Sequence, residues 1–245
     1  MKKHILYTVM LGAAVIGLAS CMGIDNWDAP DARFHGKIID SYTGENLLSS
    51  QNDWSIRIWE RSWEEGIPNH QSLAVKQDGT YNNSKLFAGT YDMLPYGGPF
   101  WPCDTVKNVV LKKTHEQDFT VTPYLQVIDF NATLSGTDLT LTCRLKAPRR
   151  EGLPNLYEIM PFLSLTTFCG NGADSRIDIG EYNNRRIQIN KSWKDEVGDS
   201  ETSNLYTIGP LPVKSGYTYY VRVGASVNDA NRKHNYSPIV KITVP

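Results

Sequence analysis

Apolar and polar side chains alternate over several short stretches of this chain, as they do in β-strands that bury one face. The clearest stretch is 139–146, in which Leu and Cys residues at odd positions alternate with Thr, Arg and Lys residues at even positions. Residues 217–225 repeat the pattern with Tyr, Val and Ala. Both stretches predict strands with one face in a core and the other toward solvent.

Further strands follow from the same reasoning. Residues 54–59 predict one, because Trp54, Ile56 and Ile58 alternate with Ser55, Arg57 and Trp59. No segment of useful length has the helical period, so the sequence predicts an all-β fold. The remaining β-rich runs are bounded by turn residues such as Asp78-Gly79-Thr80, and they lie at 34–40, 86–91, 106–111, 119–121, 125–129 and 239–244.

The strand pattern pauses at Pro123 and Tyr124 and then restarts at Leu125. For a chain of 245 residues, this predicts two β-sandwich domains in tandem, 33–122 and 123–245. The second domain is longer than a usual sandwich of about 100 residues. We therefore expect an insertion between Gly170 and Leu205, whose Gly, Asn and Asp content is typical of long loops.

The N-terminus has the pattern of an export signal. Lys2 and Lys3 precede an apolar run from Ile5 to Leu18, and small residues lead to Cys21. The site resembles a bacterial lipobox, which implies a signal peptide at 1–20, lipidation of Cys21 and a tether over 21–32. The alternative is a transmembrane anchor, but the apolar run is shorter than the roughly 20 residues that a spanning helix needs.

Short motifs in the first domain resemble those of the carboxypeptidase-regulatory-like domain, a small transthyretin-like sandwich. They are Gly36–Asp40, Thr43–Leu47, Asp78–Tyr81 and Ala88–Tyr91, in that order. The resemblance implies a structural or presenting module with no catalytic residues to transfer.

The end of the second domain resembles a fibronectin type III or immunoglobulin-like sandwich. The resemblance rests on Leu211–Val223 and on Ser237-Pro238 before the last strand. It implies that Tyr219 is a corner tyrosine, whose hydroxyl bonds to nearby backbone and stabilises the fold.

Taken together, these features resemble a Bacteroidota lipoprotein family of unknown function, encoded beside glycan importers of the starch-utilisation type. The resemblance implies a non-catalytic role in glycan capture at the outer membrane, with a lipid anchor, a polysaccharide or oligosaccharide ligand and a transporter complex as partners. Asp25, Asp28 and Asp31 are similar to a signal for surface export. We expect display at the cell surface, with the periplasmic leaflet as the alternative.

Aromatic residues in loops are the candidates for ligand binding, because their rings can lie against the apolar faces of sugars. The stretch Tyr96–Pro102 contains Tyr96, Phe100 and Trp101 among glycines and prolines. It forms either a binding loop or a plug at the end of the sandwich. Trp59 is either part of a platform or buried against the second domain, and Trp193 in the insertion has the same two interpretations.

Enzymatic and metal-dependent functions have little support in the sequence. The histidines are scattered and show neither His-Glu-x-x-His nor Cys-x-x-Cys spacing, so we expect no catalytic residue, no metal and no cofactor. Asn171, Asp174 and Asp178 lack the regular ligand spacing of a calcium loop. A hydrolase stays open as a third hypothesis, since sequence cannot place two carboxylates across a cleft.

Charge and cysteine content limit the remaining possibilities. The net charge is −1 and no long basic run is present, which disfavours a nucleic-acid ligand. Besides Cys21 the chain has Cys103, Cys143 and Cys169. Cys143 is expected as a buried thiol, and a bridge to Cys169 is the alternative within the second domain.

A second hypothesis for the function competes with glycan capture. In it the protein is a structural or protein-interaction accessory of a transporter, without a ligand of its own.

Overall fold

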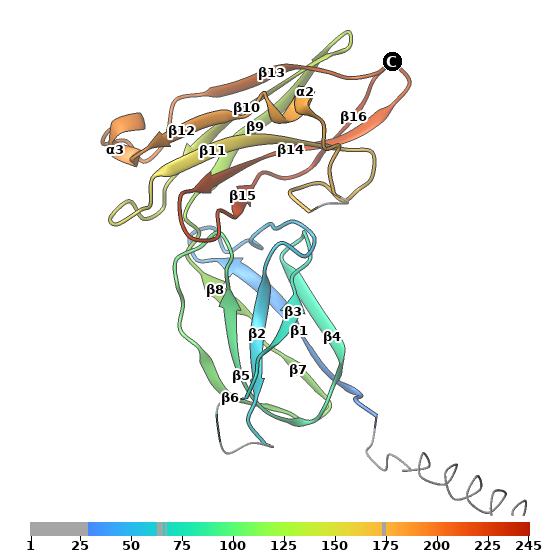
Figure 1. Ribbon diagram of the computed structural model, residues 1–245, viewed down its shortest axis with the longest axis vertical. Coiled ribbons are helices and arrows are strands. Elements are labelled where there is room, and N and C mark those ends of the chain that lie inside the picture. The colour runs from blue at the N-terminus through green and yellow to red at the C-terminus, as the bar shows by residue number, and fades with distance from the viewer. Residues whose placement is uncertain (1–28, 63–65, 67, 173–174) are drawn as a thin grey trace, which may run out of the picture. The chain divides into compact units, whose positions relative to one another are not determined.

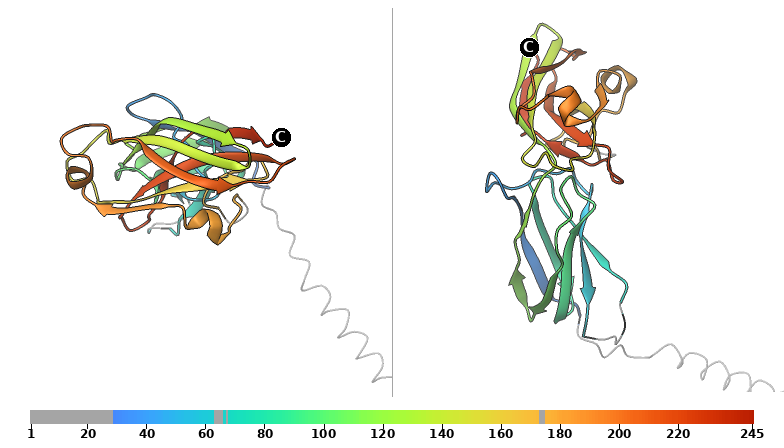
Figure 2. Two further views of the ribbon diagram at one scale, coloured as in Figure 1. Left: turned by 90° about the horizontal axis from the view of Figure 1, so that it is seen from above. Right: turned by 90° about the vertical axis from the view of Figure 1, so that its left-hand side faces the viewer.

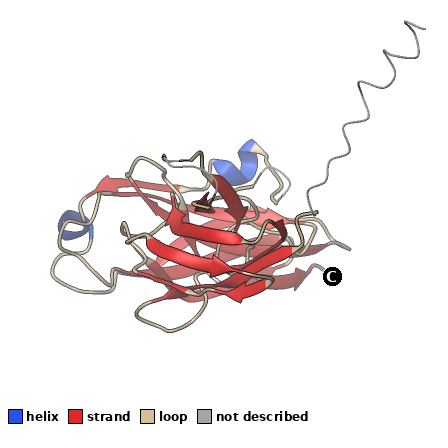
Figure 3. Cartoon of the chain, turned by 90° about the horizontal axis from the view of Figure 1, so that it is seen from below, coloured by secondary structure: helices blue, strands red, loops and turns tan. Residues whose placement is uncertain are grey.

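The computed structural model describes residues 29–62, 66, 68–172 and 175–245. Asp31–Pro245 form one compact unit. The predicted signal peptide, Cys21 and most of the predicted tether lie outside the described residues. Within those residues strands predominate, and helix is limited to two short segments, as Figure 3 shows. The all-β prediction is therefore confirmed.

The first sandwich contains two sheets that face each other as separate layers (Figures 1 and 2). In one sheet β1 pairs with β4 on one side and, in parallel, with β7 and β8 on the other. The second sheet is antiparallel, in the order β3-β2-β5-β6. The strand bounds are β1 (Ala32–Asp40), β2 (Ser55–Glu60), β3 (Gln71–Ala74), β4 (Thr80–Leu86), β5 (Gly89–Tyr96), β6 (Val106–Leu111), β7 (Thr114–Glu116) and β8 (Phe119–Val121).

Alternation along β2 determines which side chains enter the first core. Ile56 and Ile58 are fully buried, whereas Arg57 and Trp59 lie on the outer face and are half-buried. This is the arrangement that the period of two predicts.

The prediction of a strand over 86–91 is wrong. Leu86 ends β4 and Gly89 begins β5, so the run spans a connection between two strands.

The second sandwich also has two sheets. One has the order β13-β10-β9, and the other places β11 and β14 at its centre, with β12, β15 and β16 outside them. The element bounds are β9 (Gln126–Ser135), β10 (Asp138–Lys146), β11 (Leu156–Ser164), α2 (Gly180–Asn183), β12 (Ile187–Lys191), α3 (Trp193–Glu196), β13 (Tyr206–Pro212), β14 (Thr218–Val227), β15 (His234–Tyr236) and β16 (Val240–Thr243).

The stretch expected as an insertion is more ordered than its composition suggests. It contributes an edge strand, β12, and both short helices rather than loops alone. β10 follows its prediction closely, since all four odd positions from Leu139 to Leu145 are buried in the second core. Among the described residues, neither helix is long and apolar enough to cross a membrane.

Buried polar side chains connect the two sandwiches within this compact unit. The guanidinium of Arg222 is 1% exposed, donates to the carbonyl of Ser49 at 2.7 Å and lies 3.8 Å from the ring centroid of Tyr236. The amide of Asn235 donates to the Pro99 carbonyl at 3.0 Å and accepts from the Leu125 N–H at 3.1 Å. Because each contact joins chemically matched groups, the junction is specific rather than a loose apolar contact.

Candidate functional site

The aromatic loop predicted as a binding site packs mainly inward. Phe100 is 5% exposed, and its ring meets Trp54 edge-on with centroids 5.1 Å apart. Gly98 lies against the same ring, so that a Cβ at this position would be 2.1 Å from a Phe100 ring carbon. The prediction that Phe100 contacts a ligand is therefore wrong, because the ring has no free face.

Trp101 belongs to the junction between the sandwiches. Its backbone N–H donates to the Thr122 carbonyl at 2.8 Å, and its half-buried ring lies 5.3 Å from that of Tyr124. The guanidinium of Arg149 covers the ring at 4.4 Å from its centroid. These contacts match the plug alternative for the loop better than the binding alternative.

Trp193 is also buried, at 5% exposure, as part of the second core. Its indole N–H donates to the Ser200 carbonyl at 2.8 Å, which satisfies its one polar atom. Direct stacking of a ligand on Trp193 is therefore another prediction that the structure corrects. The buried interpretation of Trp193 is the one that the structure supports.

Two predicted site residues do reach the surface. Tyr96 is 45% exposed at the end of β5, with the guanidinium of Arg57 3.4 Å from its ring centroid. Trp59 is half-buried and lies 5.9 Å from the ring of His70, centroid to centroid. Tyr219, assigned a folding role, is buried, and its hydroxyl accepts from the Lys214 N–H at 3.1 Å.

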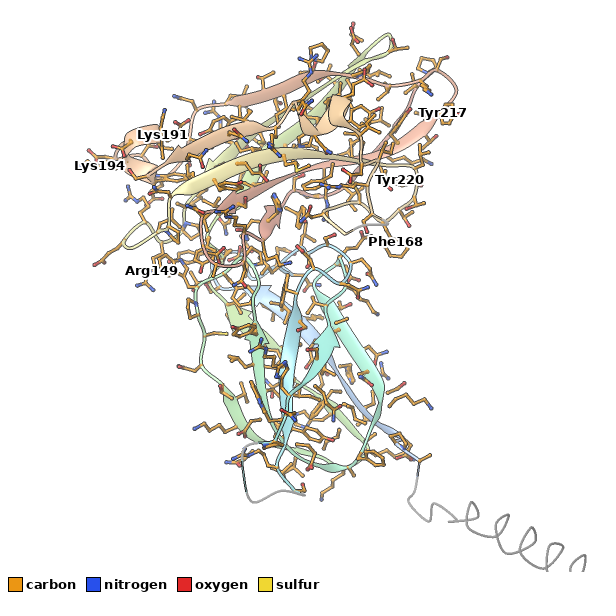
Figure 4. All side chains as sticks on the ribbon, in the orientation of Figure 1. Arg149, Phe168, Lys191, Lys194, Tyr217 and Tyr220 are labelled. Atoms are coloured by element: carbon orange, nitrogen blue, oxygen red, sulfur yellow. The ribbon has the colours of Figure 1, made fainter. Side chains whose placement is uncertain are left out.

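A polar groove near Trp101 and Trp193 is the best candidate site. The exposed aromatic ring that lines it belongs to Tyr42, a residue that the sequence analysis did not identify as a candidate. The groove has a volume of about 510 Å³, and Arg149 and Lys194 of its lining lie at the same end of the second sandwich in Figure 4. Its lining comprises Tyr42, Pro148, Arg149, Arg150, Glu151, Trp193, Lys194, Gly198, Asp199 and Glu201.

A tight turn after β1 holds Tyr42, which is 57% exposed. The carboxylate of Asp40 accepts from the Tyr42 N–H at 2.8 Å and from the Gln126 side chain at 2.6 Å. The Gly44 N–H donates to the Asp40 carbonyl at 2.9 Å, and Gly44 has φ of 72°, a conformation that favours glycine. The backbone under the exposed ring is thus fixed before any ligand arrives.

The opposite wall of the groove is fixed by α3 and the segment after it. Ser192 caps α3, since its hydroxyl accepts from the Asp195 N–H at 3.1 Å. Arg150 donates to the carbonyl of Asp199. Three cationic and three acidic side chains line the groove, so their formal charges balance. An exposed ring beside planar polar groups suits an uncharged, polyhydroxylated ligand such as a sugar.

The described residues contain no accessible metal centre of the kind considered from the sequence. No group of three or more His, Cys, Asp or Glu side chains among the described residues could hold a metal ion. Of the calcium candidates, Asp174 lies outside the described residues. The guanidinium of Arg176 pairs with Asp178 at 3.1 Å and donates to the Asn171 side chain at 3.2 Å. Both oxygen donors are therefore engaged by a cation of the protein.

A serine, a histidine and a glutamate do come together on β14, β15 and β11. Ser226 is paired in register with both His234 and Glu158, and Nε2 of His234 is 3.4 Å from Oε1 of Glu158. Burial acts to raise the pKa of Glu158, but its contact with His234 and the charge of Arg186 outweigh burial and lower the pKa. All three side chains are buried, so a substrate cannot reach them.

All three described cysteines are free thiols. Cys143 lies in the main core of the second sandwich, and burial raises its pKa to about 12. Cys169 lies in a different cluster, with Phe162 and Tyr236, and its thiol donates to the Phe162 carbonyl at 3.4 Å. The buried thiol predicted at Cys143 is confirmed, and the alternative bridge between Cys143 and Cys169 is not formed.

Comparison with solved structures shows the same fold in related proteins. A structure from Bacteroides uniformis, described as a "putative carbohydrate binding protein", is 29% identical with a TM-score of 0.69, over 87% of this chain and 99% of that one. A DUF3823 family protein from B. uniformis is 22% identical with a TM-score of 0.69, over 88% and 100%. One from Parabacteroides merdae is 21% identical with a TM-score of 0.64, over 88% and 100%.

Comparison with curated proteins found none that matches the chain. Two family models do match, and both are of domains whose function is unknown. Residues 32–122 match the N-terminal domain of DUF3823, and residues 125–241 match the domain DUF3823_C. The chain thus belongs to the DUF3823 family, a family of unknown function.

Proposed function

We propose that this chain is a non-catalytic glycan-binding lipoprotein that assists glycan capture at the outer membrane. The B. uniformis relative with the carbohydrate-binding description supports the ligand class, since it aligns over 87% of this chain. The lipobox-like sequence ending at Cys21 supports the anchor. Replacing Cys21→Ser should release the protein from the membrane fraction, and retention there would contradict lipid anchoring.

The observation that carries the proposal is the rigid presentation of Tyr42 over the polar groove. Its ring is 57% exposed although its backbone is held at both ends of the turn. A sugar that stacks on this ring can also bond through its hydroxyls to Arg149, Glu151 and Lys194. Because the ring and the turn are already ordered, little conformational entropy is lost on binding.

The carboxylates of the groove do not resemble a glycosidase pair. A general acid of that kind needs an apolar environment that raises its pKa. Glu151, Asp199 and Glu201 are all exposed to solvent instead. This environment supports binding without catalysis.

Affinity electrophoresis of the full chain, purified in detergent, against a panel of soluble neutral polysaccharides tests the proposal. Tyr42→Ala should weaken binding about tenfold, because it removes the stacking surface. Tyr217→Ala is the matched control: this tyrosine is 49% exposed and lies at the other end of the second sandwich (Figure 4). No binding to any polysaccharide, or equal binding by the Tyr42 and Tyr217 variants, would contradict the proposal.

The rival function, a structural or interaction accessory of an outer-membrane transporter, has one observation in its favour. Phe100 packs at the end of the first sandwich and Trp101 packs at the junction, so both rings contact the protein rather than a ligand. If the polysaccharide panel fails, cross-linking in intact membranes should capture a transporter subunit. Failure of both experiments would contradict both functions.

A further inference from the structure

Figure 1 shows the sheet β3-β2-β5-β6 as one layer of the first sandwich. The half-buried ring of Trp59 and the exposed ring of Tyr96 share its outer face, because both alternate with buried positions along their strands. Trp59 on β2 is paired in register with Asp92, and Ser55 is paired with Tyr96. Four residues along a strand span about 13 Å. The two rings therefore stand at separate points along one face.

Arg57 lies between these two rings. Its guanidinium carbon is 3.4 Å from the ring centroid of Tyr96, and it is paired in register with Leu94. Stacking on the ring fixes the orientation of the guanidinium group. The N–H groups of the guanidinium lie in its plane and point outward from the edge, away from the stacked ring. These donors have no hydrogen-bond partner among the described residues.

Some other charged groups of this sheet, all among the described residues, are already paired or engaged. Arg61 lies 3.6 Å from Asp92 in an ion pair on the same sheet. The carboxylate of Glu60 accepts from the Ser62 N–H at 2.6 Å. Within the part of the chain that the structure describes, Arg57 forms no ion pair, so its charge remains available for an external anion.

We propose that this face is a second glycan site, which binds an acidic polysaccharide through the uronate carboxylates of its sugars. A carboxylate matches the planar fork of Arg57 in a bidentate contact. Trp59 and Tyr96 contact the sugars on either side of that unit. The groove at Tyr42, with balanced charges, suits neutral sugars, so the two sites differ in ligand class.

This site stands independently of the groove, and its test separates the two. Titration calorimetry of the full chain uses sodium polygalacturonate, the same polymer after full methyl esterification and a neutral galactan. The wild type should bind polygalacturonate, lose at least tenfold in affinity on esterification and bind more weakly as salt rises. Tight binding of the esterified polymer, or no binding of polygalacturonate, would overturn the proposal.

Variants locate the site on the molecule. Arg57→Gln should lower polygalacturonate affinity at least tenfold, and Arg57→Lys should recover part of the loss because it restores charge without the fork. Arg232→Gln is the matched control, since the Arg232 guanidinium also stacks on a tyrosine, at 4.5 Å from the Tyr157 ring. Unchanged affinity in Arg57→Gln, or an equal loss in Arg232→Gln, would contradict the assignment. Binding of neutral polysaccharides should depend on Tyr42 and not on Arg57.

Discussion

Replacing Phe100→Ala should destabilise the protein without removing a ligand contact. The ring is 5% exposed, meets Trp54 at 5.1 Å and rests on Gly98. Truncation of a buried Phe to Ala lowers the free energy of unfolding by about 3–5 kcal/mol. This figure includes the lost burial, the cavity that remains and the lost contact between the two aromatic rings. We expect about 4 kcal/mol, since Gly98 has no side chain that could fill the space. For a cooperative unit of this size, that lowers the melting temperature by about 8–16 °C.

Thermal unfolding followed by circular dichroism measures this change. Tyr96→Ala is the matched control from the same loop region, because its ring is 45% exposed and stacks with the guanidinium of Arg57. This variant should lose no more than about 1.5 kcal/mol. A Phe100→Ala protein that melts within about 2 °C of the wild type would refute the reasoning that the loop is a plug.

Three further predictions concern the second sandwich and the thiols. Trp193→Ala should cost about 3–5 kcal/mol in urea unfolding, because it empties a core position and leaves the Ser200 carbonyl without its donor. At pH 8, peptide mass spectrometry should find Cys103 alkylated before Cys143, whose buried thiol has a pKa raised to about 12. The pKa of Glu158 is lowered in the folded state, so its stabilising contribution is present above pH 4.5 and is lost as the pH falls through the lowered value. The stability difference between wild type and Glu158→Gln should therefore shrink on acidification, and a constant difference would contradict this.

Local alternation predicted some of the strands that bury one face, but not all of them. β10 is the best example, because all four odd positions from Leu139 to Leu145 are buried. The method failed for β4, whose interior Asn82 and Asn83 have low strand propensity and whose partner is β1, far away in sequence. The run 86–91 resembled a strand because it joins the apolar ends of two strands.

The candidate site was less predictable, because exposure of a single ring depends on contacts that are distant in sequence. For Phe100 and Trp193 the sequence left an exposed and a buried interpretation open, and long-range packing buries both rings. Tyr42 shows the opposite case. A local signal did exist, since an aromatic residue between Asp40 and Gly44 occupies a turn where no core can cover it.

The most direct test of the proposed function compares three proteins on one polysaccharide panel: wild type, Tyr42→Ala and Phe100→Ala, each at a temperature where it is folded. The account predicts that Phe100→Ala binds as the wild type does and that Tyr42→Ala loses about tenfold in affinity. Loss of binding in Phe100→Ala together with full binding in Tyr42→Ala would contradict it and would return the ligand to the aromatic loop.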